Sequence, residues 1–147
     1  MRVLGIDIGA RRIGVAISDE LGFTAQPLPT IDRKQVRSGV KAVAAIVAEH
    51  GAERVVYGLP LNMNGSEGPA AVNAREFAAA LAELVDVPLI PCDERLTTVE
   101  AEQVLRETGV SRKKRRSKVD QIAAQIILQG WLDARAAEQA REEEEGQ

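Results

Sequence analysis

The 147-residue chain is predicted to be an α/β protein with a five-stranded mixed sheet flanked by helices. Two observations lead to this fold class. Three short apolar runs near the N-terminus are separated by turns alone, which is typical of antiparallel strands. Two later apolar runs are each reached through a helical pattern, and a helical crossover joins parallel strands. The length is enough for a single domain with its own core.

The predicted sheet begins with a hairpin. Runs rich in β-branched residues over 3–6 and 13–17 surround a glycine-containing turn. A third extended segment covers 23–31, where Pro27 and Pro29 each remove a backbone donor. Proline is tolerated in a sheet mainly on an edge strand, so we expect this third strand at the sheet edge.

The middle of the chain alternates between helix and strand. Asp32 is predicted to be the N-cap of a first helix, with Gln35 completing a capping box, and Gly51 is expected to end that helix. The run 54–59 is predicted to be an interior strand. Pro69 suits the first residue of a second helix, because its missing N–H is unpaired there in any case.

The last third is predicted to hold one strand and two helices. The strand covers 87–92, and a capping box at Thr97–Glu100 begins a helix that Gly109 ends. The basic stretch 112–118 is predicted to be a loop, and a long helix is expected from about 119 to 137.

Composition indicates a globular, intracellular protein. The chain is 45% hydrophobic and 28% charged, far from disordered composition. No apolar run approaches the roughly 20 residues of a membrane span, and the N-terminus lacks a signal-peptide pattern. The single cysteine, Cys92, excludes an internal disulfide. We therefore expect a cytoplasmic protein with no membrane partner.

Charge is distributed unevenly along the chain. The formal net charge is −3, yet residues 138–147 alone contain five glutamates and one arginine. We expect these residues to form a flexible, solvated acidic tail behind a single domain of residues 1–137. Six of the seven residues in 112–118 are basic. This local cluster predicts a polyanionic partner near it, although an idle charge run is the alternative.

Three carboxylates occupy positions that packing alone does not explain. Asp7 ends the first predicted strand, Glu94 follows the last strand, and Asp120 borders the apolar face of the final helix. An ionised carboxylate taken out of water costs several kcal/mol unless it is compensated. If the first and last strands run parallel near the sheet's centre, their carboxyl ends meet at one sheet edge, where the final helix could deliver Asp120.

Converging carboxylates repel one another unless cations neutralise them. Their hard oxygen atoms suit Mg²⁺ or Mn²⁺. Two such ions about 4 Å apart would support phosphodiester hydrolysis by an activated water. Structural alternatives exist for each carboxylate. Asp120 could serve only the dipole of a first helical turn, Glu94 could be an exposed turn residue, and Asp7 could cap the following turn.

Four motifs occur in order along the chain and resemble the YqgF family, also called RuvX. Members of this family are described as Holliday junction resolvases or as nucleases that mature the precursor of small-subunit ribosomal RNA. The resemblance covers almost the whole chain except the acidic tail. The motifs begin at Asp7-Ile8-Gly9, Val56-x-Gly58-Leu59-Pro60, Asp93-Glu94-Arg95-Leu96-Thr97 and Lys118-x-Asp120.

The resemblance implies a ribonuclease H-like, divalent-metal-dependent nuclease. Asp7, Glu94 and Asp120 correspond to the family's catalytic and metal-binding triad. The expected activity is 5′-end maturation of the 16S ribosomal RNA precursor by a monomer or homodimer. The alternatives are a Holliday junction resolvase on branched DNA and a non-catalytic RNA-binding module. A sugar-kinase-like phosphate binder is disfavoured because the chain is too short for a second domain. The residues expected to contact substrate are Arg12, Asn62, Arg95, Thr97, Lys113, Lys114, Arg115, Arg116 and Lys118.

Overall fold

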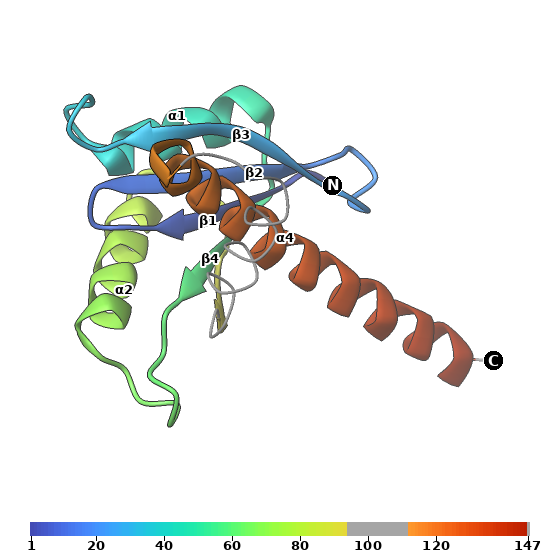
Figure 1. The fold of residues 1–147 in the computed structure, drawn as a ribbon. Helices are drawn as coiled ribbons and strands as arrows, with labels where there is room; N and C mark the ends of the chain where they lie inside the picture. Colours follow the sequence, from blue (N-terminus) through green and yellow to red (C-terminus); the bar gives the residue numbers. More distant parts are fainter. Residues whose placement is uncertain (94–111, 147) are drawn as a thin grey trace.

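The computed structural model describes residues 1–93 and 112–146, with only the backbone described over 112–118. A five-stranded sheet with the order β3-β2-β1-β4-β5 forms its centre. Helices cover both faces of this sheet (Figure 1). None of the helices within the described ranges is long and apolar enough to cross a membrane. The elements are β1 Val3–Ile8, β2 Arg12–Ser18, β3 Ala25–Asp32, α1 Gly39–His50, β4 Arg54–Leu59, α2 Pro69–Ala82, β5 Leu89–Asp93 and α4 Arg112–Glu145.

The predicted topology is confirmed. β1 pairs with β2 and β2 with β3 in antiparallel fashion, whereas β1 pairs with β4 and β4 with β5 in parallel. The proline-containing strand β3 is an edge strand, and β4 is interior, as expected. β1 and β5 run in the same direction, as expected, but β4 separates them. The expected position of the last strand near the centre of the sheet is wrong, because β5 is the edge strand opposite β3. The carboxyl ends of β1, β4 and β5 therefore share one edge of the sheet.

Alternate residues of β1 enter different cores. Leu4, Ile6 and Ile8 belong to the larger core beneath α1 and α2, and Val3 belongs to a smaller core beneath α4. This alternation follows from the pleat of a strand. A strand buried on both faces is a continuous apolar run in the sequence, and residues 3–6 of β1 are such a run.

Glycines in β1 and β2 let α4 approach the sheet closely. A Cβ added at Gly14 would lie 1.9 Å from the backbone carbonyl oxygen of Asp120, and one at Gly5 would lie 2.7 Å from Cβ of Leu128. Either contact is impossible without moving the helix. These two residues therefore set the distance between α4 and the sheet.

Three glutamines one helical turn apart join α4 to the edge strand. Gln129 accepts a hydrogen bond from the Ala25 N–H at 2.9 Å and donates one to the Phe23 carbonyl at 2.9 Å. Gln121 donates to the Leu28 carbonyl at 2.8 Å, and Gln125 donates to the Ala25 carbonyl at 3.4 Å. Backbone groups along β3 are thus paired with side chains of α4.

The single tryptophan marks the other side of the α4 contact. Trp131 packs against the smaller core. The guanidinium groups of Arg54 on β4 and Arg135 on α4 lie 5.8 and 5.5 Å from its ring centroid. Both distances are within the range of cation–π attraction.

The start predicted for the first helix is wrong. Asp32 is the last residue of β3, where it pairs with Arg12, and its side chain accepts a hydrogen bond from the Lys34 N–H. The helix begins at Gly39 instead, and Ser38 is its N-cap, with its hydroxyl oxygen accepting a hydrogen bond from the Lys41 N–H at 3.2 Å. Both residues are good N-caps, so local sequence could not separate them. The predicted end at Gly51 is confirmed, with φ of 62°.

The predicted loop at 112–118 is also wrong, because these residues form the first two turns of α4. Arginine and lysine are good helix formers, and this propensity outweighs the repulsion between them. Asp120 is therefore not in a first helical turn, so the helix-dipole explanation for it no longer applies. α4 also continues through the acidic segment to Glu145. The helix predicted from Thr97 to Gly109 lies outside the described residues.

Candidate active site

Asp7 lies on the face of the sheet that α4 covers. Its cross-strand partner in the β1–β2 ladder is Gly14. Directly opposed residues point to the same side of a sheet, and a Cβ on Gly14 would point at the Asp120 carbonyl. The half-buried Asp7 is thus one strand away from the helical turn that carries Asp120. The sequence predicts that these two carboxylates lie at one sheet edge, and the described backbone contacts place Asp7 and Asp120 on the same face of the sheet.

Asp120 is paired with Arg12. The Nε atom of Arg12 donates a hydrogen bond to Oδ2 of Asp120 at 2.9 Å, and the two side chains are 28% and 22% exposed. Burial raises the pKa of the Asp120 carboxyl, while the hydrogen bond and charge of Arg12 oppose that rise. Arg12 is therefore the countercharge that helps to keep a partly buried carboxylate ionised.

A tight turn between β1 and β2 holds Arg12 in place. The Gly9 N–H donates to the Arg12 carbonyl at 2.9 Å, and a Cβ at Gly9 would lie only 2.5 Å from that oxygen. Arg33 also supports the turn, since its Nη1 donates to the Gly9 carbonyl at 2.9 Å. The Arg33 guanidinium lies 5.5 Å from the ring centroid of Phe77 on α2.

Sequence reasoning missed Arg33. No motif marks it, and the contact joins residues 24 positions apart. The helix expected to start at Asp32 placed Arg33 in a first helical turn, whereas Arg33 directly follows β3 and the helix begins only at Gly39. Arg33 is best described as a positioning residue, because its side chain acts on the turn that carries Arg12.

Asn62 lies in the loop after β4, at the same sheet edge as the end of β1. Its backbone N–H donates to the Ser66 carbonyl at 2.9 Å, and its side-chain amide donates to the Ser66 hydroxyl at 3.0 Å. Its carbonyl oxygen accepts a bond from the Gly65 N–H at 2.8 Å. Asn62 is exposed and closes its own loop. Among the described contacts, none joins it to Arg12 or Asp120.

The other expected site residues are not tested by the described geometry. Glu94, Arg95 and Thr97 lie outside the described residues, immediately after the end of β5. Lys113, Lys114, Arg115, Arg116 and Lys118 lie on the first two turns of α4, where only the backbone is described. The helix places this basic segment directly before Asp120.

Cys92 near the end of β5 has the features of a packed thiol. It contacts the smaller core, and burial raises its pKa. A thiol with a raised pKa stays protonated at neutral pH and is a poor nucleophile. The environment of Cys92 therefore fits a structural side chain and not a catalytic nucleophile.

Within the described ranges, no group of three or more histidine, cysteine, aspartate or glutamate side chains is arranged to hold a metal ion. Asp7 and Asp120 supply carboxylate oxygens from one face of the sheet. Such oxygens are the hard ligands that Mg²⁺ and Mn²⁺ prefer. These two residues fit a divalent cation in chemistry, and a third ligand would have to come from elsewhere.

Comparison with known proteins gives a consistent result. Residues 1–134 match the family model described as RuvX, Holliday junction resolvase. A Myxococcus xanthus protein named "Putative pre-16S rRNA nuclease" is 52% identical over 134 residues, covering 91% of this chain and 89% of the relative. A Moorella thermoacetica protein of the same name is 50% identical over 133 residues, covering 90% and 95%.

Solved structures confirm the predicted ribonuclease H-like fold. Thermus thermophilus RuvC in complex with a Holliday junction superposes with a TM-score of 0.58 at 17% identity, covering 92% of this chain and 96% of that one. Fowlpox virus resolvase in complex with Holliday junction DNA superposes with a TM-score of 0.57 at 15% identity, covering 91% of this chain and 98% of that one. At these identities the likeness establishes the fold alone.

Proposed function

Because the chain belongs to the RuvX family, we propose that it is a divalent-metal-dependent nuclease that matures the 5′ end of the 16S ribosomal RNA precursor in the cytoplasm. The observation that carries this proposal is the placement of Asp7 and Asp120 on one face of the sheet, with Arg12 as countercharge. Relatives about half identical over most of the chain bear a pre-16S rRNA nuclease name.

Asp7, Asp120 and Glu94 would hold Mg²⁺ or Mn²⁺. Two such ions would activate a water and stabilise the leaving oxygen of the scissile phosphodiester. Asp7 lies on β1, which is paired with its neighbours in the sheet. Asp120 lies on α4, which packs closely against glycines of the sheet. Both carboxylates are therefore preorganised by rigid elements, which is what a metal site requires.

Substrate binding is assigned to the cations around these carboxylates. Arg12 reaches Asp120 and is 28% exposed, so its guanidinium can bind a phosphate at the same place. The basic segment 113–118 continues along α4 and would contact the sugar-phosphate backbone. Arg95 and Thr97, beside Glu94 in the sequence, and Asn62, in the loop at the same sheet edge, complete the proposed contact set.

A second candidate substrate is a four-way DNA junction, because the matching family model is described as a Holliday junction resolvase. Resolution of a junction needs two symmetric cuts, hence two active sites in a homodimer. Single-strand maturation of RNA needs one active site and is compatible with a monomer. A non-catalytic RNA-binding module would bind the same RNA and cleave neither substrate.

The deciding experiment compares wild-type protein with Asp7→Asn. Each is incubated with labelled precursor RNA and with a four-way DNA junction, in Mg²⁺, Mn²⁺ or chelator. We expect wild-type protein to cleave the RNA only with metal, and Asp7→Asn to bind RNA without cleaving it. Asp86→Asn is the matched control, since Asp86 is exposed at the opposite end of the parallel strands. It should cleave like wild type.

Other outcomes would contradict particular parts of the proposal. Cleavage that survives Asp7→Asn or chelation would exclude the metal site. Cleavage of the junction in preference to the RNA, by a dimer, would replace the RNA nuclease with a resolvase. Binding of RNA without cleavage by wild-type protein would favour the non-catalytic module.

A further inference from the structure

The turn between β2 and β3 presents two large apolar side chains to solvent. Leu21 is 75% exposed and Phe23 is 64% exposed. The turn itself is firmly built, because the N–H groups of Phe23 and Thr24 donate to Oδ1 of Asp19 at 2.7 and 2.8 Å. Backbone donors, that of Thr24 first, hold the pKa of the Asp19 carboxyl below its usual value. The backbone that carries these exposed side chains is thus held in place by the Asp19 carboxylate.

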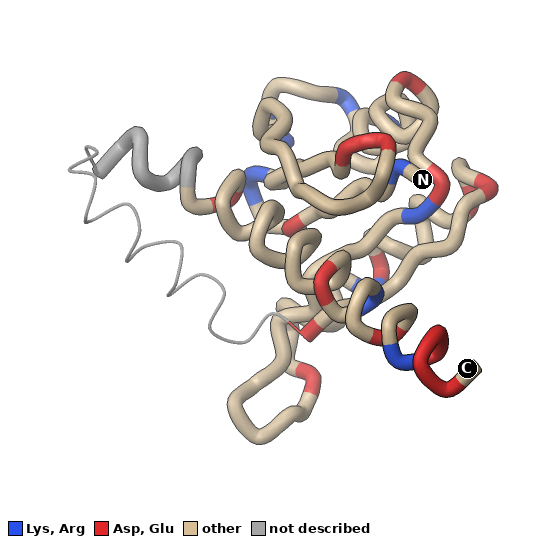
Figure 2. The backbone as a smooth tube through the Cα atoms, turned by 90° about the vertical axis from the view of Figure 1, so that its right-hand side faces the viewer, with Lys and Arg blue, Asp and Glu red and all other residues tan. Residues whose placement is uncertain are grey.

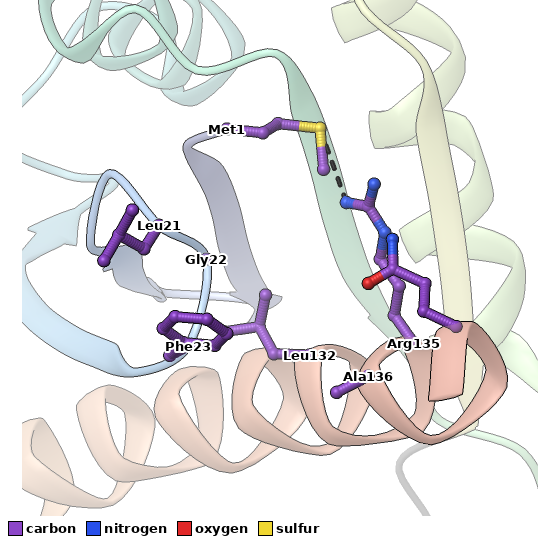
Figure 3. A pocket seen from close by; sticks show the side chains of 8 residues that line it. Met1, Leu21, Gly22, Phe23, Leu132, Arg135 and Ala136 are labelled. Carbon is purple, nitrogen blue, oxygen red and sulfur yellow. Dashed lines mark hydrogen bonds between the residues drawn. The ribbon is translucent and has the colours of Figure 1, made fainter. Parts of the chain in front are cut away.

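A pocket of about 210 Å³ lies between this turn and α4. Figure 3 shows Phe23 beside Leu132, with Arg135 donating a hydrogen bond to the sulfur of Met1 at 3.5 Å. The residues that α4 contributes recur at helical spacing, so they form one face of the helix. They are Leu132, Arg135, Ala136 and Gln139.

The same face of α4 continues into the acidic segment. Glu142 and Glu143 follow Gln139 by three and four positions, which places them in line with the pocket. Both are exposed, as are Glu138, Glu144 and Glu145. Glu142 lies six residues beyond Ala136, about 9 Å along the helix axis. Figure 2 shows the acidic residues gathered at the C-terminal end of the chain.

We propose that the pocket and the acidic face together bind a basic, amphipathic polypeptide segment of a partner protein. An apolar side chain of the partner would pack against Leu21, Phe23 and Ala136. Lysine or arginine side chains about 9 Å away would pair with Glu142 and Glu143. The exposed apolar side chains of the β2–β3 turn adjoin a face of α4 that continues from Ala136 to the acidic residues, and this adjacency carries the inference. Arg135 on that face is engaged with Met1 and Trp131.

The charge of this surface selects the class of partner. Five glutamates against one arginine in residues 138–147 repel nucleic acid and anionic membranes and attract cationic chains. The pocket is also separate from the candidate active site, because Leu132 follows Asp120 by twelve residues, about 18 Å along α4. The inference is therefore independent of the proposed nuclease function.

The test is selection of peptides from a phage-displayed random library on the immobilised full-length chain. We expect enriched peptides to carry an apolar residue followed by lysine or arginine. Synthetic copies of these peptides should bind the protein in solution, measured by fluorescence anisotropy. Leu21→Ser should weaken that binding at least about tenfold, whereas Leu84→Ser, at a leucine 49% exposed beyond α2, should leave it unchanged.

The acidic face is tested by a second pair of variants. Glu142→Gln combined with Glu143→Gln should weaken peptide binding and reduce its salt dependence, whereas Glu76→Gln combined with Glu83→Gln on the exposed face at α2 should not. Enriched peptides without a basic bias, no enrichment, or binding unaffected by Leu21→Ser would overturn the proposal. Self-association of the chain that Leu21→Ser abolishes would assign the surface to a second copy instead.

Discussion

At the residue scale, the contact between Arg12 and Asp120 joins the hairpin turn to the final helix across 108 positions of sequence. The two groups lie in a partly buried position where the carboxylate would otherwise tend to protonate. Arg12 thus has two roles in the proposed site. It keeps Asp120 ionised, and it supplies a cation where a phosphate would approach.

Replacing Arg12 should shift the titration of Asp120. Arg12→Gln removes both influences that oppose the effect of burial, so the pKa of the Asp120 carboxyl should rise further. Metal ligation needs the deprotonated carboxylate, so the acid limb of Mg²⁺ or Mn²⁺ binding should move to higher pH. NMR titration of the carboxyl carbons in metal-free protein measures the pKa of Asp120. Calorimetric titration with metal at several pH values measures the shift in metal binding.

Arg11→Gln is the control for that titration. Arg11 is 57% exposed, and its guanidinium lies 3.9 Å from the carboxylate of Asp32. Exposed ion pairs of this kind contribute little interaction free energy, so Arg11→Gln should leave the pKa of the Asp120 carboxyl unchanged. Equal shifts of the Asp120 pKa in the Arg12 and Arg11 variants would show that the ion pair with Arg12 does not control this pKa.

At the element scale, the position of α4 depends on two glycines of the sheet. Gly5 and Gly14 have no side chains at the points where the helix crosses β1 and β2. The glutamines on α4 then fix its rotation by pairing with backbone groups of β3. An edge strand whose backbone groups are paired in this way is also a poor template for a further strand. The close packing of α4 against the sheet therefore also sets the position of Asp120.

Substitution of Gly14 should separate α4 from the sheet. The added methyl of Gly14→Ala would meet the Asp120 carbonyl at 1.9 Å, so we expect a loss of about 1–3 kcal/mol or more in the free energy of unfolding. Gly130→Ala, on the same helix with no atom within 4 Å of the new methyl, should gain up to about 1 kcal/mol. Urea unfolding midpoints test both, and a Gly14→Ala protein as stable as wild type would contradict the close approach.

At the scale of the whole molecule, α4 carries opposite charges at its two ends. Its first seven residues include six cations, and its last four are glutamates. The net charge of −3 conceals this separation. A polyanion is therefore expected at the end that carries Asp120, and a polycation at the other end.

The salt dependence of nucleic-acid binding should report the basic end. Combined Lys113→Gln, Lys114→Gln, Arg115→Gln and Arg116→Gln should weaken RNA binding and lower the slope of log K against log salt by up to about 3. A triple variant of exposed cations across the sheet, Lys34→Gln, Arg37→Gln and Lys41→Gln, should leave the slope unchanged. Equal slopes in the wild type and the quadruple variant would exclude the basic segment from the footprint.

Much of the fold could be read from the sequence because its strands are short apolar runs with clear breaks. The strand directions, the edge position of β3 and the interior position of β4 follow from periodicity, proline placement and connection length. The position of β5 at the other edge could not be read from these signals. Where α1 begins could not be read, since Asp32 and Ser38 are comparable caps, and the helical start of α4 was hidden by its charge. Arg33 escaped prediction because the helix was expected to start at Asp32, which placed Arg33 in a helix and not beside Gly9.

The indole of Trp131, with two arginines beside it, is an intrinsic fluorescence probe of this molecule. The chain has one tryptophan, and it lies where α4 meets β4, between Arg54 and Arg135. Its fluorescence therefore reports a single event, the seating of α4 on the sheet, without any introduced label. Unfolding followed by this emission measures detachment of the helix that carries Asp120, whereas circular dichroism averages over all helices.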